Sequence, residues 1–305
     1  MSSVVKKQTL IFDYNNLAFR TIFTKDVGIT TPNPDFQTWR YLTFNSIYLA
    51  MNKYKYINEV ILAMDDNKTW RKLFFPRYKE TRKKARKKKQ DVDWTTMYEN
   101  FNGLAYDIKT HLPIKVLKVS QCEADDVIGI LSLKQIKNDI IVVSNDEDYK
   151  QLLVKKNIRV YDPRKMKYME CGDPDMFIVE KCLLGQKKDD IFNILTPSDY
   201  GQTPETEGKR KPGFGPAALK KVMAYEGGWE KWLKDNDFED RFHKRNKILM
   251  DFNKIPLSIR NNITKAYNGY EYPNADNIHK FFKKNHFRAF LDDYTRVENK
   301  LLSLY

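Results

Sequence analysis

The chain has few residues of the kinds that hold soft metals or form disulfides. Its 305 residues include three cysteines and four histidines, and none of them stands at the spacing of a zinc site. An odd number of cysteines without a C-x-x-C pair is typical of a reducing compartment. No apolar run of about 18 residues could cross a membrane, and the N-terminus shows no signal-peptide pattern. We therefore expect a cytoplasmic protein without structural zinc, disulfides or a membrane segment.

Acidic residues are nearly absent from one stretch of an otherwise balanced chain. Residues 71–89 contain eleven Lys or Arg and a single acid, Glu80, so this stretch supplies +10 of the net charge of +14. Such a run is often a solvated charge run or a targeting signal. Here aromatic residues flank it on both sides, including Trp70 and Trp94. Basic charge beside aromatic side chains favours contact with a nucleic acid.

Carboxylates follow four apolar runs of the kind expected for buried parallel strands. The runs end at Asp13, at Asp65–Asp66, at Glu123–Asp126 and at Asp146–Asp148. The carboxyl ends of parallel strands meet along one edge of an open α/β sheet. Two unit charges about 4 Å apart repel by about 4 kcal/mol at an effective dielectric of 20. A shared edge would therefore need bound cations.

Each acid also has a simpler interpretation. Asp13, Asp125 and Asp146 each precede a predicted helix, where an aspartate commonly caps the helix. A cap needs one acid, however, and the third and fourth runs supply more than one. Oxygen ligands without His or Cys suit Mg²⁺, with Mn²⁺ as a substitute. The number of carboxylates predicts two ions about 4 Å apart, which suits phosphodiester hydrolysis because both the attacking and the leaving oxygen are stabilised.

Apolar periodicity predicts an α/β fold. Strands are predicted at residues 8–13, 59–65, 114–119, 139–144 and 158–161. Helices are predicted at residues 36–54, 93–111, 124–137, 147–154 and 174–184. This alternation implies a mostly parallel central sheet flanked by helices. Residues 196–216 hold most of the Pro and Gly and are expected to be loop, and the remainder to residue 305 has helical periodicity only.

Together, the acidic and basic motifs resemble the flap endonuclease family of 5′ nucleases, most closely its phage branch. The shared features, in family order, are Phe12-Asp13, Met64-Asp65, Tyr78-Lys79-x-x-Arg82, Glu123-Ala124-Asp125-Asp126, Ser144-x-Asp146-x-Asp148, Gly185-x-x-x-Asp189 and Gly213-Phe214-Gly215-Pro216. No single motif is specific, whereas the ordered set is. The resemblance implies a PIN-like nuclease core with a helical arch, and a helical C-terminal region that contains a helix–hairpin–helix-type element.

The resemblance also implies which acids hold metal. The first Mg²⁺ would be surrounded by Asp13, Asp65, Glu123, Asp125 and Asp146, with Asp126 beside them. The second would be held by Asp148 and Asp189 with help from Asp146. The family usually has Gly-Asp-x-x-Asp-Asn where this chain has Gln186 after Gly185 and Asp190 after Asp189. The uncharged Gln186 implies a weaker second site, which Asp190 would partly compensate unless it only caps a turn.

Nucleic-acid contacts are implied in the same way. Lys79 and Arg82, at the base of the arch, would meet the scissile phosphate and act in catalysis with Asp13 and Asp146, while Tyr78 would stack on a base. The arch itself would be lined by Lys83, Lys84, Arg86 and Lys87 and would pass a 5′ single strand. The turn at Gly213 and Gly215, with Lys220, would bind a duplex phosphate, and a monovalent cation would sit in that turn.

The predicted protein is a Mg²⁺-dependent 5′ nuclease, both exonuclease and flap endonuclease. It would act on flap, nicked or forked DNA and on RNA–DNA hybrids, and would remove RNA primers in phage DNA replication in the host cytoplasm. We expect a monomer with a nuclease core at residues 1–185, including the arch at 70–92. A helical region at 186–305 would carry the DNA-binding element near 208–226. The tail at 296–305 would dock on a single-strand-binding protein or a sliding clamp.

Two other functions compete with this one. A PIN-type ribonuclease would explain the carboxylates but neither the basic insert nor the turn at Gly213 and Gly215. A catalytically weak, structure-specific DNA-binding protein is favoured only by Gln186.

Overall fold

The computed structural model describes residues 7–31, 34–82, 85 and 92–305. The chain forms two compact units that interleave along the sequence. The first comprises Met1–Lys68, Lys89–Glu170 and Ser258–Tyr305, and the second Thr69–Lys88 and Cys171–Leu257. The predicted boundary at residue 185 divides the chain once, whereas packing assigns the last helices to the first unit and the start of the basic segment to the second.

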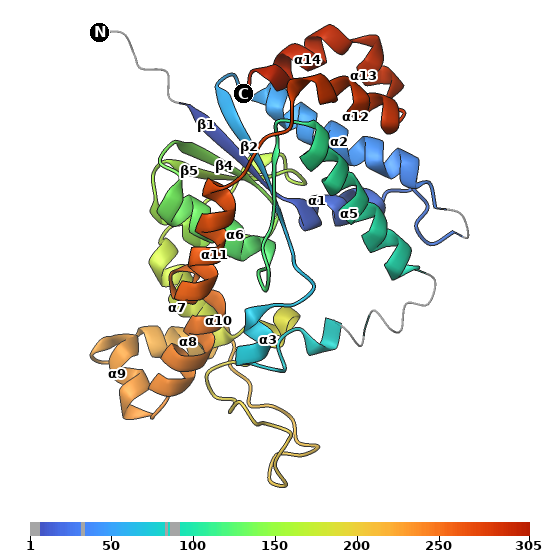
Figure 1. The fold of residues 1–305 in the computed structure, drawn as a ribbon. Coiled ribbons are helices and arrows are strands. Elements are labelled where there is room, and N and C mark those ends of the chain that lie inside the picture. Colours follow the sequence, from blue (N-terminus) through green and yellow to red (C-terminus); the bar gives the residue numbers. More distant parts are fainter. Residues whose placement is uncertain (1–6, 32–33, 83–84, 86–91) are drawn as a thin grey trace, which may run out of the picture. The chain divides into compact units, whose positions relative to one another are not determined.

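A six-stranded sheet forms the centre of the first unit (Figure 1). The strands are β1 Gln8–Asp13, β2 Ile57–Met64, β3 Lys115–Lys118, β4 Asp139–Val143, β5 Ile158–Asp162 and β6 Lys167–Tyr168. They stand in the order β3-β2-β1-β4-β5-β6. β1 to β5 pair in parallel and β6 is antiparallel. The predicted mostly parallel sheet is confirmed, while the two-residue β6 is too short for periodicity to reveal.

The strands are buried on both faces, which explains their continuous apolar runs. In β1, Leu10 and Phe12 belong to a large core on one face, while Ile11 between them points to the other face. All three have no exposed surface. Leu10 stands in register with Val60 of β2 and Ile141 of β4, so neighbouring strands share each layer.

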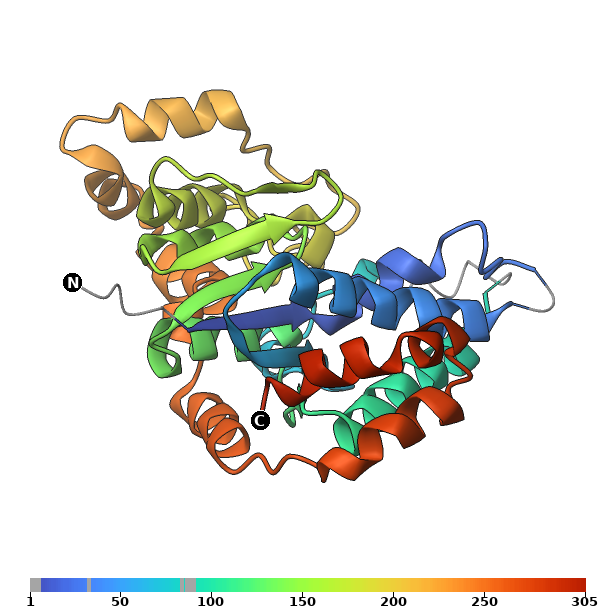
Figure 2. The same cartoon turned by 90° about the horizontal axis from the view of Figure 1, so that it is seen from above.

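Helices cover both faces of this sheet. They are α1 Tyr14–Ile22, α2 Phe36–Lys53, α5 Trp94–His111, α6 Ala124–Ile130 with its π-helical continuation Leu131–Gln135, α11 Leu257–Asn268, α12 Ile278–Lys284, α13 Arg288–Asp292 and α14 Tyr294–Leu302. A 3₁₀ segment, Glu147–Val154, follows β4, and another spans Ala275–Asn277. Figures 1 and 2 show α2, α5 and α12–α14 gathered on one face and α6 with α11 on the other. Gln135 donates to Thr264 at 3.0 Å, which ties α6 to α11.

The C-terminal helices are an integral part of the first unit. The buried Asp107 of α5 accepts hydrogen bonds from Arg40 of α2 and, at 2.6 Å, from Lys284 at the end of α12. Val297, Leu301 and Leu304 are buried in the same core as the sheet. The segment predicted to dock on a protein partner is therefore packed, and truncating it would remove core side chains.

The second unit is helical. Its helices are α3 Trp70–Phe74, α7 Pro174–Leu184, α8 Pro216–Met223, α9 Gly228–Asp235, a π-helical segment Asp240–Asn246 and α10 Lys247–Met250. Short 3₁₀ segments span Lys187–Asp189 and Phe252–Lys254. Its own core joins apolar side chains of α7, the loop after it and the π-helical segment, including Leu183, Phe192 and Phe242. Within the described residues, no helix is both long and apolar enough to span a bilayer.

Candidate active site

Two of the predicted ligands stand where the strand order reverses. Asp13 is the last residue of β1, and Asp146 follows β4, which pairs with β1 in parallel. The chain runs from β1 outward through β2 to β3 and then returns to the other side of β1 as β4. Open α/β sheets bind ligands at the carboxyl ends of strands at such a reversal point. The fold therefore places Asp13 and Asp146 where a site is expected.

Asp13 is held by a dense set of hydrogen bonds. Its Oδ1 accepts from the backbone N–H of Asn16 at 3.0 Å, so it is the N-cap of α1. Its Oδ2 accepts from the hydroxyls of Ser144, at 3.3 Å, and Tyr149, at 3.0 Å. Capping a helix and belonging to the carboxylate cluster are therefore compatible for one aspartate, since the two oxygens have different partners.

Asp65 joins the end of β2 to the start of α6. Its Oδ1 accepts from the backbone N–H of Ala124 at 2.8 Å, and its own N–H donates to the side chain of Asn15 at 2.9 Å. The first bond uses one of the N–H groups that a helix leaves without a partner at its start, and the second ties the end of β2 to the start of α1. They bring the third acidic run, which starts at Glu123, beside Asp65.

In the third acidic run, some acids cap a helix and one lies near the other carboxylates. Glu123 and Asp126 form a capping box at the start of α6, with the N–H of Glu123 donating to Asp126 at 3.0 Å. Asp126 has no exposed surface, so its place is in the cap. Asp125, next to it, is half-buried and acts electrostatically on Tyr149, as do Asp13 and Asp146.

Asp146 caps the 3₁₀ segment after β4. Its Oδ1 accepts from the N–H of Asp148 at 3.0 Å. The predicted alternative of helix capping is thus correct for Asp13 and Asp146, whereas Glu123 rather than Asp125 stands at the N-cap of α6.

The charged form of Asp13 is disfavoured by its surroundings. Burial of its carboxyl group, followed by the negative charges of Asp65 and Asp146, raises the pKa of Asp13 from its ordinary 3.8 to about 7. A bound cation would relieve that repulsion. Within the described residues, no three His, Cys, Asp or Glu side chains converge in the geometry of a metal site. The donor chemistry fits a hard divalent cation, because it is oxygen only and mutually repulsive.

The raised pKa of Asp13 predicts a stability change. The folded state keeps a proton on Asp13 between about pH 4 and pH 7 that the unfolded chain releases. The contribution of Asp13 to stability is therefore largest below about pH 4, decreases as the pH rises from about 4 to 7, and is lost above pH 7. The difference between the pKa values of Asp13 in the folded and unfolded states corresponds to at most about 4 kcal/mol of free energy. We expect Asp13→Asn to stabilise the metal-free protein by about 2 kcal/mol at pH 8, since the residue keeps some contact with solvent.

Urea unfolding in a chelator at pH 8 and pH 4 measures this effect. The advantage of Asp13→Asn should vanish at pH 4, where the wild-type carboxyl group is protonated in the folded state. Asn still accepts the N–H of Asn16, so the cap is preserved. An equal stability difference at both pH values would contradict the raised pKa of Asp13.

The two predicted catalytic cations belong to the second unit and meet the last predicted ligand there. Arg82 Nη2 lies 2.7 Å from Asp189 Oδ1, and Lys79 Nζ lies 3.9 Å from the same oxygen. Asp189 is buried, whereas Lys79 and Arg82 are half-buried. The carboxylate of Asp189 thus forms ion pairs with both Lys79 and Arg82 and keeps the two cations close together.

Tyr78 is not placed as the resemblance implied. Its side chain is 3% exposed and lies in the core of the second unit, where Lys79 Nζ stands 4.9 Å from the ring centre. A ring in that position has no open face on which a base could stack. The predicted lining of the arch, Lys83, Lys84, Arg86 and Lys87, lies outside the described residues.

The predicted phosphate-binding turn opens α8. Gly215 is the N-cap of α8, no side chain caps it, and Pro216 is the first helical residue. A Cβ at Gly213 or Gly215 would meet nothing within 4 Å, and neither glycine has a positive φ. Packing within the protein therefore does not require these glycines. Lys220 lies exposed on the same helix.

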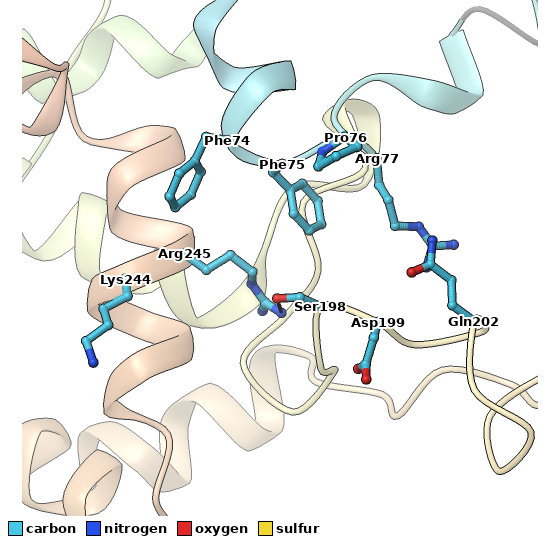
Figure 3. Close-up of a pocket in the computed structure, with 9 residues that line it drawn as sticks. All are labelled: Phe74, Phe75, Pro76, Arg77, Ser198, Asp199, Gln202, Lys244 and Arg245. Carbon is cyan, nitrogen blue, oxygen red and sulfur yellow. Dashed lines mark hydrogen bonds between the residues drawn. The ribbon is translucent and has the colours of Figure 1, made fainter.

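A cavity of about 330 Å³ in the second unit contains none of the predicted site residues (Figure 3). It is lined by Phe74, Phe75, Pro76, Arg77, Ser198, Asp199, Gln202, Lys244 and Arg245. The buried Arg245 donates to the carbonyls of Phe192, Asn193 and Thr196 at 3.2, 2.9 and 2.6 Å. It therefore ties the loop after α7 together and is not available to a ligand.

Sequence reasoning overlooked the residues that orient the carboxylates. These are Asn15, which binds the backbone of Asp65, and Ser144 and Tyr149, which donate to Asp13. Ser144 and Tyr149 lie within or beside the fourth acidic run, so their positions in the sequence mark them as candidates. Their hydrogen bonds to Asp13 depend on β1 and β4 being neighbours, which a single sequence does not reveal.

Comparison with known proteins shows the family to which the chain belongs. Residues 8–181 match the family described as 5′-3′ exonuclease, N-terminal resolvase-like domain. The chain is 31% identical over 255 residues to ribonuclease H of Enterobacteria phage T4, covering 80% of this chain and 82% of that one. The chain belongs to the 5′-3′ exonuclease family. Residues 172–296 also match the family described as T4 RNase H, C terminal.

More distant relatives extend the comparison. A 5′-3′ exonuclease of Buchnera aphidicola is 27% identical over 201 residues, which is 62% of this chain and 66% of that one. Among solved structures, the T5 D15 protein co-crystallised with metal ions has a TM-score of 0.57 at 18% identity, covering 92% of this chain and 98% of that one. The predicted PIN-like fold is thereby confirmed, and the chain is a metal-dependent 5′ nuclease like the other members of its family.

Proposed function

We propose that this 5′ nuclease removes RNA primers and 5′ flaps during phage DNA replication with the help of two Mg²⁺ ions. The observation that carries the proposal is the position of Asp13, Asp65 and Asp146 at the carboxyl ends of the adjacent strands β1, β2 and β4, where the strand order reverses and a divalent cation would balance their charge. Mn²⁺ would substitute, because both ions prefer oxygen ligands. A structural neighbour, the T5 5′-exonuclease, has divalent metal ions bound.

The proposed ligands are those that the resemblance to the 5′ nucleases implies. Asp13, Asp65, Glu123, Asp125 and Asp146 would hold the first ion. Asp146, Asp148 and Asp189 would hold the second. The ions would supply an activated water and stabilise negative charge on the attacking and leaving oxygens. Asp126 is omitted because it is wholly buried in the capping box.

The chain's own residues would orient the substrate. Lys79 and Arg82 would contact the scissile phosphate, Arg82 through paired N–H groups and Lys79 as a point charge. The exposed start of α8 at Gly213 and Gly215, with Lys220, would hold a duplex phosphate through backbone N–H groups and a monovalent cation. None of these contacts reads a base, so recognition would follow the structure of the nucleic acid.

The substrates would be flap, nicked or forked DNA and RNA–DNA hybrids. The enzyme would act as a monomer in the cytoplasm of an infected cell. A single-strand-binding protein or a sliding clamp remains a candidate partner. Any docking by the C-terminal segment would have to use its surface residues, such as Leu302 and Tyr305, which are 39% and 53% exposed.

A substrate comparison tests the proposal. With Mg²⁺, we expect the protein to cut a 5′-flap DNA and the RNA strand of an RNA–DNA hybrid, and to leave single-stranded RNA intact. Cleavage of single-stranded RNA in preference to the flap would favour the PIN-type ribonuclease. Tight flap binding without turnover in either Mg²⁺ or Mn²⁺ would favour a non-catalytic DNA-binding protein.

Gln186 offers a test of the second ion. Gln186 precedes the 3₁₀ turn that carries Asp189, and a carboxylate there would add a charge beside a proposed ligand. We expect Gln186→Asp to lower the Mg²⁺ concentration that gives half-maximal cleavage by about threefold to tenfold, since charge count tunes cation affinity. The control is Lys187→Gln, which changes the net charge by the same amount at the next, exposed position. An unchanged Mg²⁺ dependence would remove the argument for a weakened second site.

A further inference from the structure

We propose that residues 187–190 form a clamp that fixes the start of the basic segment, and that Asp190 is its central positioning residue. The clamp would hold Lys79 and Arg82 in the orientation in which they meet a phosphate. This inference rests on the proposed function of those two cations. It adds a residue whose carboxylate contacts neither substrate nor metal.

The backbone of residues 187–190 accepts two of the clamp's hydrogen bonds. The N–H of Lys79 donates to the carbonyl of Asp189 at 2.9 Å, and Nε of Arg82 donates to the carbonyl of Lys188 at 3.0 Å. Both partners belong to the second unit. These bonds attach each proposed catalytic cation to the same short turn.

The side chain of Asp190 supplies the other two bonds. Its Oδ2 accepts from the N–H and from the hydroxyl of Thr81, each at 2.8 Å. Residues 80–82 are helical, so the N–H of Thr81 is one of those that a helix leaves without a partner at its start. Asp190 therefore caps this helical turn from a distant part of the chain, and its negative charge is favourable at a helix N-terminus.

The turn itself is firmly built. Gln186 and Ile191 exchange backbone hydrogen bonds of 2.8 and 3.1 Å, which close the turn. Gly185 has a φ of 71°, and a Cβ there would lie 2.5 Å from the backbone of Phe192. Asp190 has a φ of 57°, a left-handed conformation that is uncommon for any residue other than glycine. Such conformations persist where the surroundings hold them, often at functional sites.

The clamp leaves the ion pairs of Asp189 free to exchange. Arg82 is attached twice, through Nε to the carbonyl of Lys188 and through Nη2 to the carboxylate of Asp189. A phosphate could replace the carboxylate at Nη2 while the Nε bond keeps the guanidinium in place. Lys79, at 3.9 Å, pairs with Asp189 more loosely. A fixed backbone with exchangeable side-chain partners is what a positioning device requires.

Three variants and a control test the clamp. Asp190→Ala removes both acceptor contacts, Thr81→Val removes the hydroxyl donor, and Asp190→Asn keeps a neutral acceptor. Thr81 is exposed, so the variants should still fold. The control, Asp199→Ala, deletes an exposed carboxylate in the same unit. The measurements are the single-turnover cleavage rate of a 5′-flap DNA at saturating enzyme and hydrogen exchange of the Thr81 amide without DNA.

We expect Asp190→Ala to lower the rate about tenfold with flap affinity little changed, and to abolish protection of the Thr81 amide. Asp190→Asn should remain within about twofold of wild type, as should Asp199→Ala. Asp190→Ala combined with Thr81→Val should be no slower than Asp190→Ala alone, because the contact that Thr81→Val removes is already lost in Asp190→Ala. A wild-type rate in Asp190→Ala, or a rate in Asp190→Asn as low as in Asp190→Ala, would overturn the proposal.

The two measurements separate this inference from the proposed function. If the wild-type protein cut no flap, the nuclease proposal would fail while amide exchange at Thr81 still decided whether Asp190 holds the turn. If the wild type cut normally and the Thr81 amide exchanged equally in wild type and Asp190→Ala, the clamp alone would be refuted.

Discussion

Replacing Asp146 by Asn should leave the DNA bound but uncut. Asp146 stands at the reversal point of the sheet and contributes to the repulsion that raises the pKa of Asp13. It is also the acid that we propose as a ligand of both metal ions. We expect the single-turnover rate to fall by at least about 1,000-fold, which is about 4 kcal/mol of transition-state stabilisation. Flap affinity should stay equal or rise, because one negative charge near the phosphates is removed.

The fold should tolerate this change. Asn keeps an oxygen that accepts the N–H of Asp148, so the cap of the 3₁₀ segment remains. The matched control is Glu147→Gln at the next residue, whose side chain is 62% exposed and pairs with Lys150. It should cut at the wild-type rate. Equal losses in both variants would mean that the region tolerates no substitution, and full activity in Asp146→Asn would refute its role.

Replacing Lys79 by Ala should slow cleavage by about 100-fold with a change of less than about threefold in flap affinity. The reason is that one cation held near the scissile phosphate stabilises charge that develops in the transition state, whereas many cations share the binding of the remaining phosphates. Lys79 has a φ of 54°, and Ala, also an L residue, adopts that conformation no less readily. Folding should therefore be little affected.

The control for Lys79 is Lys72→Ala, an exposed cation in the same basic segment. It should change affinity slightly at low salt and leave the rate at saturating enzyme unchanged. A loss of affinity alone in Lys79→Ala would make Lys79 a general phosphate contact. An equal loss of rate in the two variants would mean that cleavage depends on the overall charge of the segment and not on Lys79 itself.

Local signals were enough to predict the strands and the acids at their ends. Each strand is a continuous apolar run because both faces of the sheet are buried, and each ends in acid at the edge where a parallel sheet gathers its carboxyl ends. The expected competition between capping and clustering does not arise. Asp13 and Asp146 cap helical segments with Oδ1, and Asp13 meets other side chains with Oδ2.

Contacts between distant segments could not be predicted from the sequence. Tyr78 sits in a motif that favours exposure, yet its ring is buried because α7 and the loop after it provide a core beside it. Asp190 had two open interpretations, and only the approach of Thr81 identifies it as a cap. The C-terminal helices show an apolar periodicity that does not say which core they join. Asp107 with Lys284 assigns them to the first unit.

The proposed metal site is tested most directly by anomalous scattering from crystals grown with Mn²⁺. The account predicts two anomalous peaks at the carboxyl ends of β1 and β4, with Asp13, Asp65 and Asp146 among the ligands, and loss of at least one peak in Asp146→Asn. The absence of any peak at those strand ends at saturating Mn²⁺, or peaks held only by acids elsewhere on the protein, would contradict it.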